Sequence, residues 1–187
     1  MHKKLTKYIE SYDIIKDKNT LELTPNGGMI VLVNQEENCE IEINNETHEI
    51  KSFQAVLINA YENNIGIKST KNLPLNLTLV RFKGAGASFF YEEYLDELMY
   101  NPLEPIFLEN DILVDELDSY FLKRLKVGTI PFNIMKIIDL LDIQKSDYNI
   151  DEILSIANVP RRILDKTFRL RVGLTFKTYA SISERKN

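Results

Sequence analysis

The chain has 187 residues, of which 44% are hydrophobic and 27% charged, and its formal net charge is −5. This composition predicts a soluble globular protein, long enough for one large domain or two small ones. No apolar run approaches the roughly 20 residues that cross a bilayer, and no continuous apolar stretch follows the basic start, so we expect no membrane partner and no signal peptide. Cys39 is the single cysteine, which excludes an intrachain disulfide. We therefore expect a cytoplasmic protein.

The first half of the chain is predicted to be rich in strands. Residues 4–15 place apolar side chains at helical spacing and predict a short helix. Asn and Gly tolerate the positive φ of tight turns, so Pro25-Asn26-Gly27-Gly28 and Asn44-Asn45 predict turns. The uninterrupted apolar run 29–33 predicts a strand buried on both faces. Short strands are expected at 21–23, 29–33, 39–43, 47–50, 55–60, 65–68 and 75–82, a spacing typical of an antiparallel sandwich or barrel.

After residue 82 the hydrophobic spacing becomes helical. Helices are expected at 88–99, 113–125 and 132–143, with a proline-rich break at 101–105 and a polar linker at 144–149. We therefore predict an α+β fold with a β-rich domain at 1–100, a helical connector at 101–146 and a helical C-terminal unit at 147–187. The acidic side chains of the first of these helices are expected to form a solvated face, and they are Glu92, Glu93, Asp96 and Glu97.

The C-terminal unit has the pattern of a helix-turn-helix. Asn149 can cap a first helix, and Asn158-Val159-Pro160 is a break of suitable length before a second helix from Arg161 to about Arg171. In that second helix we expect Ile163, Leu164 and Phe168 to pack inward. Gly173 stands where a helix end favours a left-handed residue, and a third helix is expected from near Thr175.

Charge separates this unit from the rest of the chain. Residues 149–187 hold eight basic and four acidic side chains, a net charge of +4, whereas the other 148 residues hold 15 basic and 24 acidic ones, a net charge of −9. Such asymmetry is typical of a polyanion partner for the basic part. The same pattern also fits the end of a three-helix bundle with a solvated basic face, and the residues alone leave both interpretations open.

Residues 157–179 resemble the first helix-turn-helix of the AraC/XylS family of transcription regulators. Arg162, Leu164, Lys166 and Phe168 stand at that family's spacing, and Val172-Gly173-Leu174-Thr175-Phe176-Lys177 and Tyr179 follow as they do there. Residues 25–34, and residues 79–84 before the 88–99 helix, are similar to parts of the β-rich N-terminal domain in one subgroup. Pro160 departs from the pattern, because the family has a serine there that caps the helix.

The resemblance implies a DNA-binding transcription regulator. Its partners would be a double-stranded operator, a small-molecule effector and a second copy of the chain, and its N-terminal domain would sense the ligand or dimerise. The family carries two helix-turn-helix units, and we expect only the first within these 187 residues. The alternative is a non-enzymatic ligand-binding or protein-interaction module that pairs with a full-length regulator. The residues expected to contact DNA are Arg161, Arg162, Asp165, Lys166, Arg169 and Lys177.

The sequence argues against enzymatic chemistry. The β-rich half resembles the cupins, which often bind a metal through two or three histidines and a glutamate, but His2 and His48 are the only histidines. Gly84-Ala85-Gly86 follows a strand, yet residue 89 is Phe where a dinucleotide-binding loop needs glycine. We therefore expect no catalytic residue, metal or cofactor, and we interpret 84–86 as a tight strand-to-helix turn.

Overall fold

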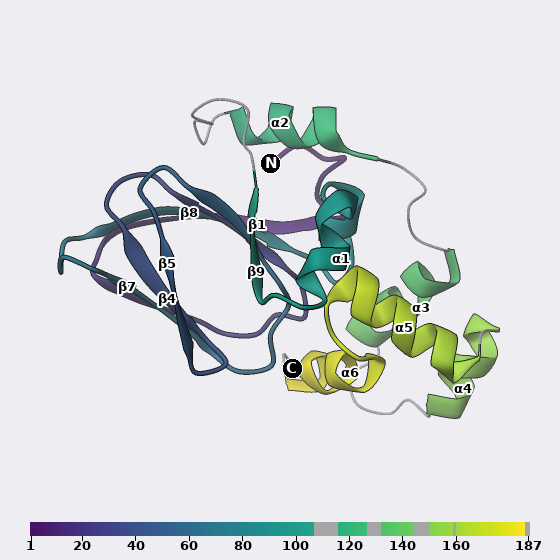
Figure 1. The fold of residues 1–187 in the computed structure, drawn as a ribbon. Helices are drawn as coiled ribbons and strands as arrows, with labels where there is room; N and C mark the ends of the chain where they lie inside the picture. Colours follow the sequence, from purple (N-terminus) through teal and green to yellow (C-terminus); the bar gives the residue numbers. More distant parts are fainter. Residues whose placement is uncertain (107–115, 127–131, 144–149, 159, 186–187) are drawn as a thin grey trace.

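The computed structural model describes residues 1–106, 116–126, 132–143, 150–158 and 160–185. Two antiparallel sheets form a sandwich, and α3 to α6 gather at one end of it (Figure 1). Among the described helices, none has the length and apolar character that a membrane span requires. In chain order, the elements are β1 (Ile9–Lys18), β2 (Thr20–Leu23), β3 (Ile30–Asn34), β4 (Cys39–Ile43), β5 (Glu46–Ile50), β6 (Ala55–Ile58), β7 (Ile65–Ser69), β8 (Leu75–Phe82), η1 (Gly86–Phe89), η2 (Glu92–Tyr94), α1 (Leu95–Leu98), β9 (Leu103–Ile106), α2 (Leu117–Arg124), α3 (Phe132–Ile143), α4 (Ile150–Ala157), α5 (Arg161–Val172) and α6 (Phe176–Arg185).

The five-stranded sheet forms the middle layer of the molecule. Its strand order is β1-β8-β3-β6-β9, and the four-stranded sheet, β2-β7-β4-β5, covers one of its faces. Alternate side chains of a strand point to opposite faces. Ile30 and Leu32 therefore enter the core between the two sheets, whereas Met29 and Val31 enter a second core that also holds the helices. The apolar run 29–33 is continuous because both faces of this strand are covered, as the sequence predicted.

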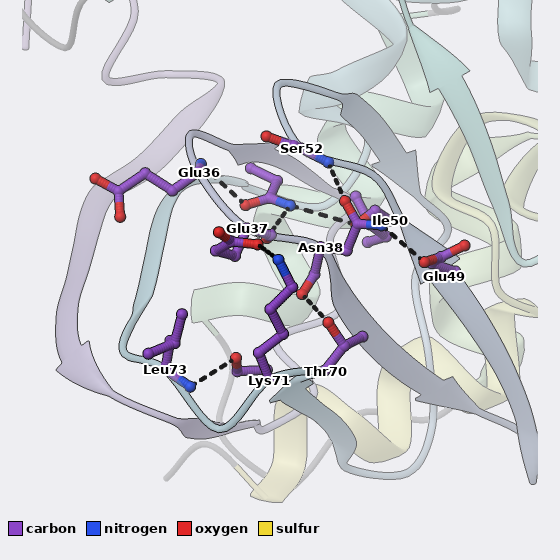
Figure 2. A network of polar contacts seen from close by, with 11 residues as sticks. Glu36, Glu37, Asn38, Glu49, Ile50, Ser52, Thr70, Lys71 and Leu73 are labelled. Carbon is purple, nitrogen blue, oxygen red and sulfur yellow. Dashed lines mark hydrogen bonds and ion pairs between the residues drawn. The ribbon is translucent and has the colours of Figure 1, made fainter.

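The end of the sandwich far from α5 and α6 is closed by polar contacts (Figure 2). Asn38 accepts a hydrogen bond from the Ser52 N–H at 2.9 Å and donates one to Glu49 at 2.8 Å. Buried Asn34 donates to the Glu37 carbonyl at 2.8 Å, and Lys71 lies 2.6 Å from the Glu37 carboxylate. These contacts pair the polar groups of the loops with one another. The residues expected to bind DNA lie at the other end of the sandwich.

The prediction of a helix at 4–15 is wrong beyond its first turn. The Ile9 N–H donates to the Leu5 carbonyl at 2.9 Å, but β1 then begins at Ile9 and runs antiparallel to β8. The apolar spacing at residues 5–12 fits a helix, but from Ile9 onward the chain pairs with β8 instead. Pairing with a long neighbouring strand decides the conformation, because strand preference depends on tertiary context.

Two further predictions in the middle of the chain need correction. The break expected at 101–105 contains β9, which pairs with β6 and places Pro105 opposite Val56. A proline lacks a backbone donor, but an edge strand tolerates it, and β9 lies at the sheet edge. The helix expected at 88–99 is divided into η1, η2 and α1. Residues 113–115 and the predicted linker 144–149 lie outside the described residues.

Two other predictions of local structure are confirmed. Asn44 and Asn45 have φ of 54° and 66° and connect β4 to β5, and α3 spans residues 132–143 as expected. The order of two antiparallel sheets followed by helices confirms the predicted α+β class with a cupin-like β-rich half.

Candidate nucleic-acid interface

The helix-turn-helix predicted at the C-terminal end is formed by α4 and α5. The first helix ends at Ala157, Asn158 has φ of 50°, and the second helix begins at Arg161. Pro160 is the N-cap, and its carbonyl accepts hydrogen bonds from the N–H groups of Ile163 (2.9 Å) and Leu164 (3.1 Å). Within the described residues no side chain caps α5, so the serine hydroxyl of the AraC/XylS pattern has no equivalent at this position.

One face of α5 is fixed in the core that holds the helices. Leu164, Phe168 and Val172 are one turn apart and are each 0% exposed. The Phe168 ring meets Phe176 edge-on at 5.4 Å and Tyr179 at 5.7 Å between ring centroids, so α6 packs against the same stripe. This packing gives α5 the rigid support that a helix needs to present side chains to a partner.

The opposite face of α5 is basic and exposed. Arg162, Lys166 and Arg169 follow at intervals of four and three residues, which puts them on one side of a helix. Arg161 at the first turn is exposed as well, and Asp165 is half-buried beside them. In the part of the chain that the structure describes, no carboxylate lies within ion-pair distance of these four basic side chains. Lys177, the remaining residue expected to contact DNA, is exposed on α6.

Arg171 behaves differently from its basic neighbours. Its guanidinium lies 2.7 Å from the Glu92 carboxylate, and only 18% of its side chain is exposed. Glu93 forms ion pairs with Lys126 at 3.2 Å and with Arg124. The acidic residues at 92–97 were expected to be a solvated face, and Glu93, Asp96 and Glu97 are indeed exposed, whereas Glu92 is half-buried beside Arg171. Glu92 instead joins the middle of the chain to α5.

Two glycines, one in the sandwich and one at the end of α5, allow the C-terminal helices to approach the sheets closely. Tyr179 of α6 lies over Gly27, where an added Cβ would stand 2.9 Å from the Tyr179 ring. Gly173 ends α5 with φ of 87°, and an added Cβ there would overlap the side-chain oxygen of Asn59. The Thr178 hydroxyl also donates to Glu62 at 3.2 Å. The sequence predicted the turn at 25–28 and the left-handed Gly173, but not their role in docking α5 and α6.

Ile163 does not lie where the sequence placed it. It was expected in the core with Leu164 and Phe168, yet 53% of the residue is exposed. Successive residues of a helix are rotated by about 100°. The stripe of Leu164, Phe168 and Val172 therefore puts Ile163 on the exposed side next to Lys166, and that four-residue spacing was the signal that could have placed it correctly.

The groups of the β-rich half to consider for metal or thiol chemistry include Cys39 and His48. Among the described residues, no three His, Cys, Asp or Glu side chains gather closely enough to hold a metal ion. Burial raises the pKa of the Cys39 thiol to about 11, so the thiol is protonated near neutral pH and lacks nucleophilic character. Half-buried His48 lies on the β4–β5 hairpin, 3.9 Å from Glu46. Gly84 to Gly86 form the expected turn, and they pack against Tyr179 and the backbone at Tyr8.

Comparisons with known proteins find likeness in structure and not in sequence. No protein-family model and no curated protein matches the chain. Solved structures of ToxT from Vibrio cholerae resemble it over most of its length, and ToxT is a regulator of the AraC family. One ToxT structure has a TM-score of 0.54 at 12% identity, and the matched region covers 92% of this chain and 79% of the ToxT chain. Another, bound to an unsaturated fatty acid, has a TM-score of 0.55 at 11% identity, with 94% and 78% covered. At this identity the likeness establishes a shared fold.

Proposed function

We propose that the chain is a DNA-binding transcription regulator of the AraC/XylS type, in which α5 enters the major groove of a double-stranded operator. The observation that carries this proposal is the two-sided character of α5. Its buried stripe packs into the core, and its exposed face presents Arg162, Lys166 and Arg169. As the second helix of a helix-turn-helix, α5 stands where such motifs have their recognition helix. The likeness to ToxT adds that the fold is one in which an AraC-family regulator is built.

The proposed contacts divide by their chemistry. Arg161, Arg162, Lys166 and Arg169 would contact base edges and phosphates, with Asp165 beside them. Lys177 on α6 would contact phosphate. A charged side chain reaching a phosphate displaces a condensed counterion, so binding should weaken steeply with salt.

One copy of α5 offers a small footprint, and a single module of this size buries roughly 600–1,000 Å². We therefore propose a homodimer that pairs two half-sites about 34 Å apart, the distance of one helical turn of DNA. In this proposal residues 1–100 sense a ligand or dimerise, residues 101–146 connect, and residues 147–187 bind DNA. The hydrophobic core runs through all three, since Val31, Ile138 and Phe168 belong to one cluster.

A small-molecule effector is part of the proposal. ToxT has been solved with an unsaturated fatty acid bound, and this chain has the same fold. A thermal-melting screen of the purified chain with unsaturated fatty acids tests that class directly, because a ligand that binds the native state raises the melting temperature with its concentration. The location we propose is the cytoplasm, where a bacterial-type regulator meets its operator.

The test of DNA binding compares two lysines that differ in location and not in chemistry. Lys166 and Lys123 are both exposed on helices, but Lys166 lies on the basic face of α5 and Lys123 on α2. Binding to a labelled library of double-stranded DNA is measured by fluorescence anisotropy between 50 and 200 mM salt. Lys166→Ala should weaken binding and lower the salt slope by about one, whereas Lys123→Ala should leave both unchanged.

The outcomes separate the proposal from its alternative. Absence of binding at every salt concentration, with the protein folded, would contradict the proposal. It would favour a non-enzymatic interaction module that pairs with a full-length regulator, and a stable complex with such a regulator would then identify that role. Equal losses for Lys166→Ala and Lys123→Ala would place the DNA contacts elsewhere than on α5.

A further inference from the structure

Ile163 is an exposed apolar residue within the basic face of α5. It is 53% exposed, and its neighbours on the helix surface are Arg162 before it and Lys166 one turn after it. The Thr167 hydroxyl donates to the Ile163 carbonyl at 2.9 Å, which holds the Thr167 side chain against the helix backbone. Half-buried Leu170 continues this side of the helix toward the core. A strip of apolar groups therefore runs beside the basic residues.

Neither packing nor helix formation accounts for isoleucine at this position. An exposed side chain forgoes most of the gain from burial. A β-branched residue is also a weaker helix former than lysine, glutamate or alanine, because its χ1 is restricted against the preceding turn. The same restriction has a use at an interface: a side chain that already occupies one rotamer loses little entropy when a partner covers it.

We propose that Ile163 determines sequence specificity by packing against the C5-methyl group of a thymine in the major groove. This inference rests on the proposed function, because it requires α5 to lie in that groove. There, thymine is the base that displays a methyl group, and apolar side chains contact it. Arg162 adjoins Ile163 and can donate two hydrogen bonds to the O6 and N7 of a guanine. The preferred half-site should therefore contain a thymine within a base pair or two of the guanine bound by Arg162.

The experiment removes one methyl group from the DNA and one side chain from the protein. The full chain first selects its preferred sites from a random double-stranded library. Each thymine of the selected half-site is then replaced in turn by deoxyuridine, which lacks only the C5-methyl group. Affinities of wild type and Ile163→Ala are measured by fluorescence anisotropy. Ile163→Val serves as the conservative variant, and Ile163→Gln, whose polar side chain suits an exposed helix position, replaces Ile163→Ala if that protein fails to fold.

One deoxyuridine should weaken wild-type binding about fourfold, the loss expected for one methyl group no longer buried. With Ile163→Ala the same replacement should change binding less than twofold, while Ile163→Val should retain most of the discrimination. The salt slope of Ile163→Ala should equal that of wild type, because no charge is lost. Arg169→Ala, in contrast, should reduce the salt slope by about one.

Each result decides between the two proposals. If the protein binds DNA but no deoxyuridine effect depends on Ile163, the inference is overturned and the proposed function stands. Selected sites that lack thymine would overturn it in the same way. If the folded protein binds no DNA at all, both the proposed function and the inference fail, and the exposed Ile163 becomes a candidate contact for a protein partner.

Discussion

Gly173→Ala tests whether the end of α5 is locked onto the sandwich. Gly173 has φ of 87°, and an added Cβ would overlap the Asn59 side-chain oxygen. That oxygen accepts a hydrogen bond from the Ala60 N–H at 2.9 Å, and the Asn59 amide donates to the Leu98 carbonyl at 2.8 Å. The methyl group therefore cannot be accommodated unless Asn59 moves and gives up these hydrogen bonds.

The expected cost has two parts. A left-handed backbone costs a residue with a Cβ about 1–2 kcal/mol. Displacing Asn59 forfeits two hydrogen bonds, each worth a net of about 1 kcal/mol. Together these lower the free energy of unfolding by about 3–4 kcal/mol. For a chain of this length, each kcal/mol lowers the melting temperature by roughly 2–4 °C, so Gly173→Ala should melt about 6–16 °C below wild type.

The assay is urea unfolding followed by circular dichroism, with Gly66→Ala as the matched control. Gly66 lies in β7, and no heavy atom would come within 4 Å of an added Cβ there. Its replacement should change stability by less than about 0.5 kcal/mol. Asn59→Ala removes the clashing oxygen, so the double variant should be more stable than the sum of the single effects predicts. A loss below 0.5 kcal/mol for Gly173→Ala, or strictly additive effects, would refute the reasoning.

Two further predictions concern buried and paired side chains. Burial raises the pKa of Tyr61 to about 12, with Arg81 opposing the shift. An unfolded tyrosine ionises near pH 10. The stability that protonated Tyr61 contributes to the folded state is therefore fully present below pH 10 and is lost as the pH rises toward 12. The free energy of unfolding, measured with urea, should therefore fall less steeply between pH 9 and 11.5 in Tyr61→Phe than in wild type. Equal slopes for the two proteins would contradict this. The Arg171–Glu92 pair is partly exposed. A double-mutant cycle with Arg171→Gln and Glu92→Gln should yield a coupling below about 1 kcal/mol, and a larger value would show that solvent screens it less than assumed.

The elements that could be predicted from sequence are those in which local pattern and tertiary role agree. The run 29–33 is apolar at every position because both faces of β3 are covered, and Asn44-Asn45 supplies the positive φ that the hairpin needs. β1 and β9 were missed for the opposite reason. Their local patterns indicate a helix and a break, and the strand conformation comes from β8 and β6, which lie far away in sequence.

The same distinction applies to the candidate site. Spacing within α5 was enough to separate the buried Leu164 and Phe168 from the exposed Arg162 and Lys166. The pairing of Arg171 with Glu92 joins residues 79 positions apart, and no local pattern encodes it. Ile163 was misplaced because hydrophobicity was given more weight than helical position.

The position of α5 follows from its attachment to the sandwich. Leu164, Phe168 and Tyr179 share one core with Val31 and Phe82 of the five-stranded sheet. The turn at 25–28 reaches α5 through Tyr179, and the loop after β6 reaches it through Gly173. Under the proposed function, a dimer formed through the sandwich would hold its two α5 helices at a spacing set by packed side chains. In that proposal, a ligand that shifted either loop would move α5 relative to its operator, and sensing and DNA binding would be connected through these packed contacts.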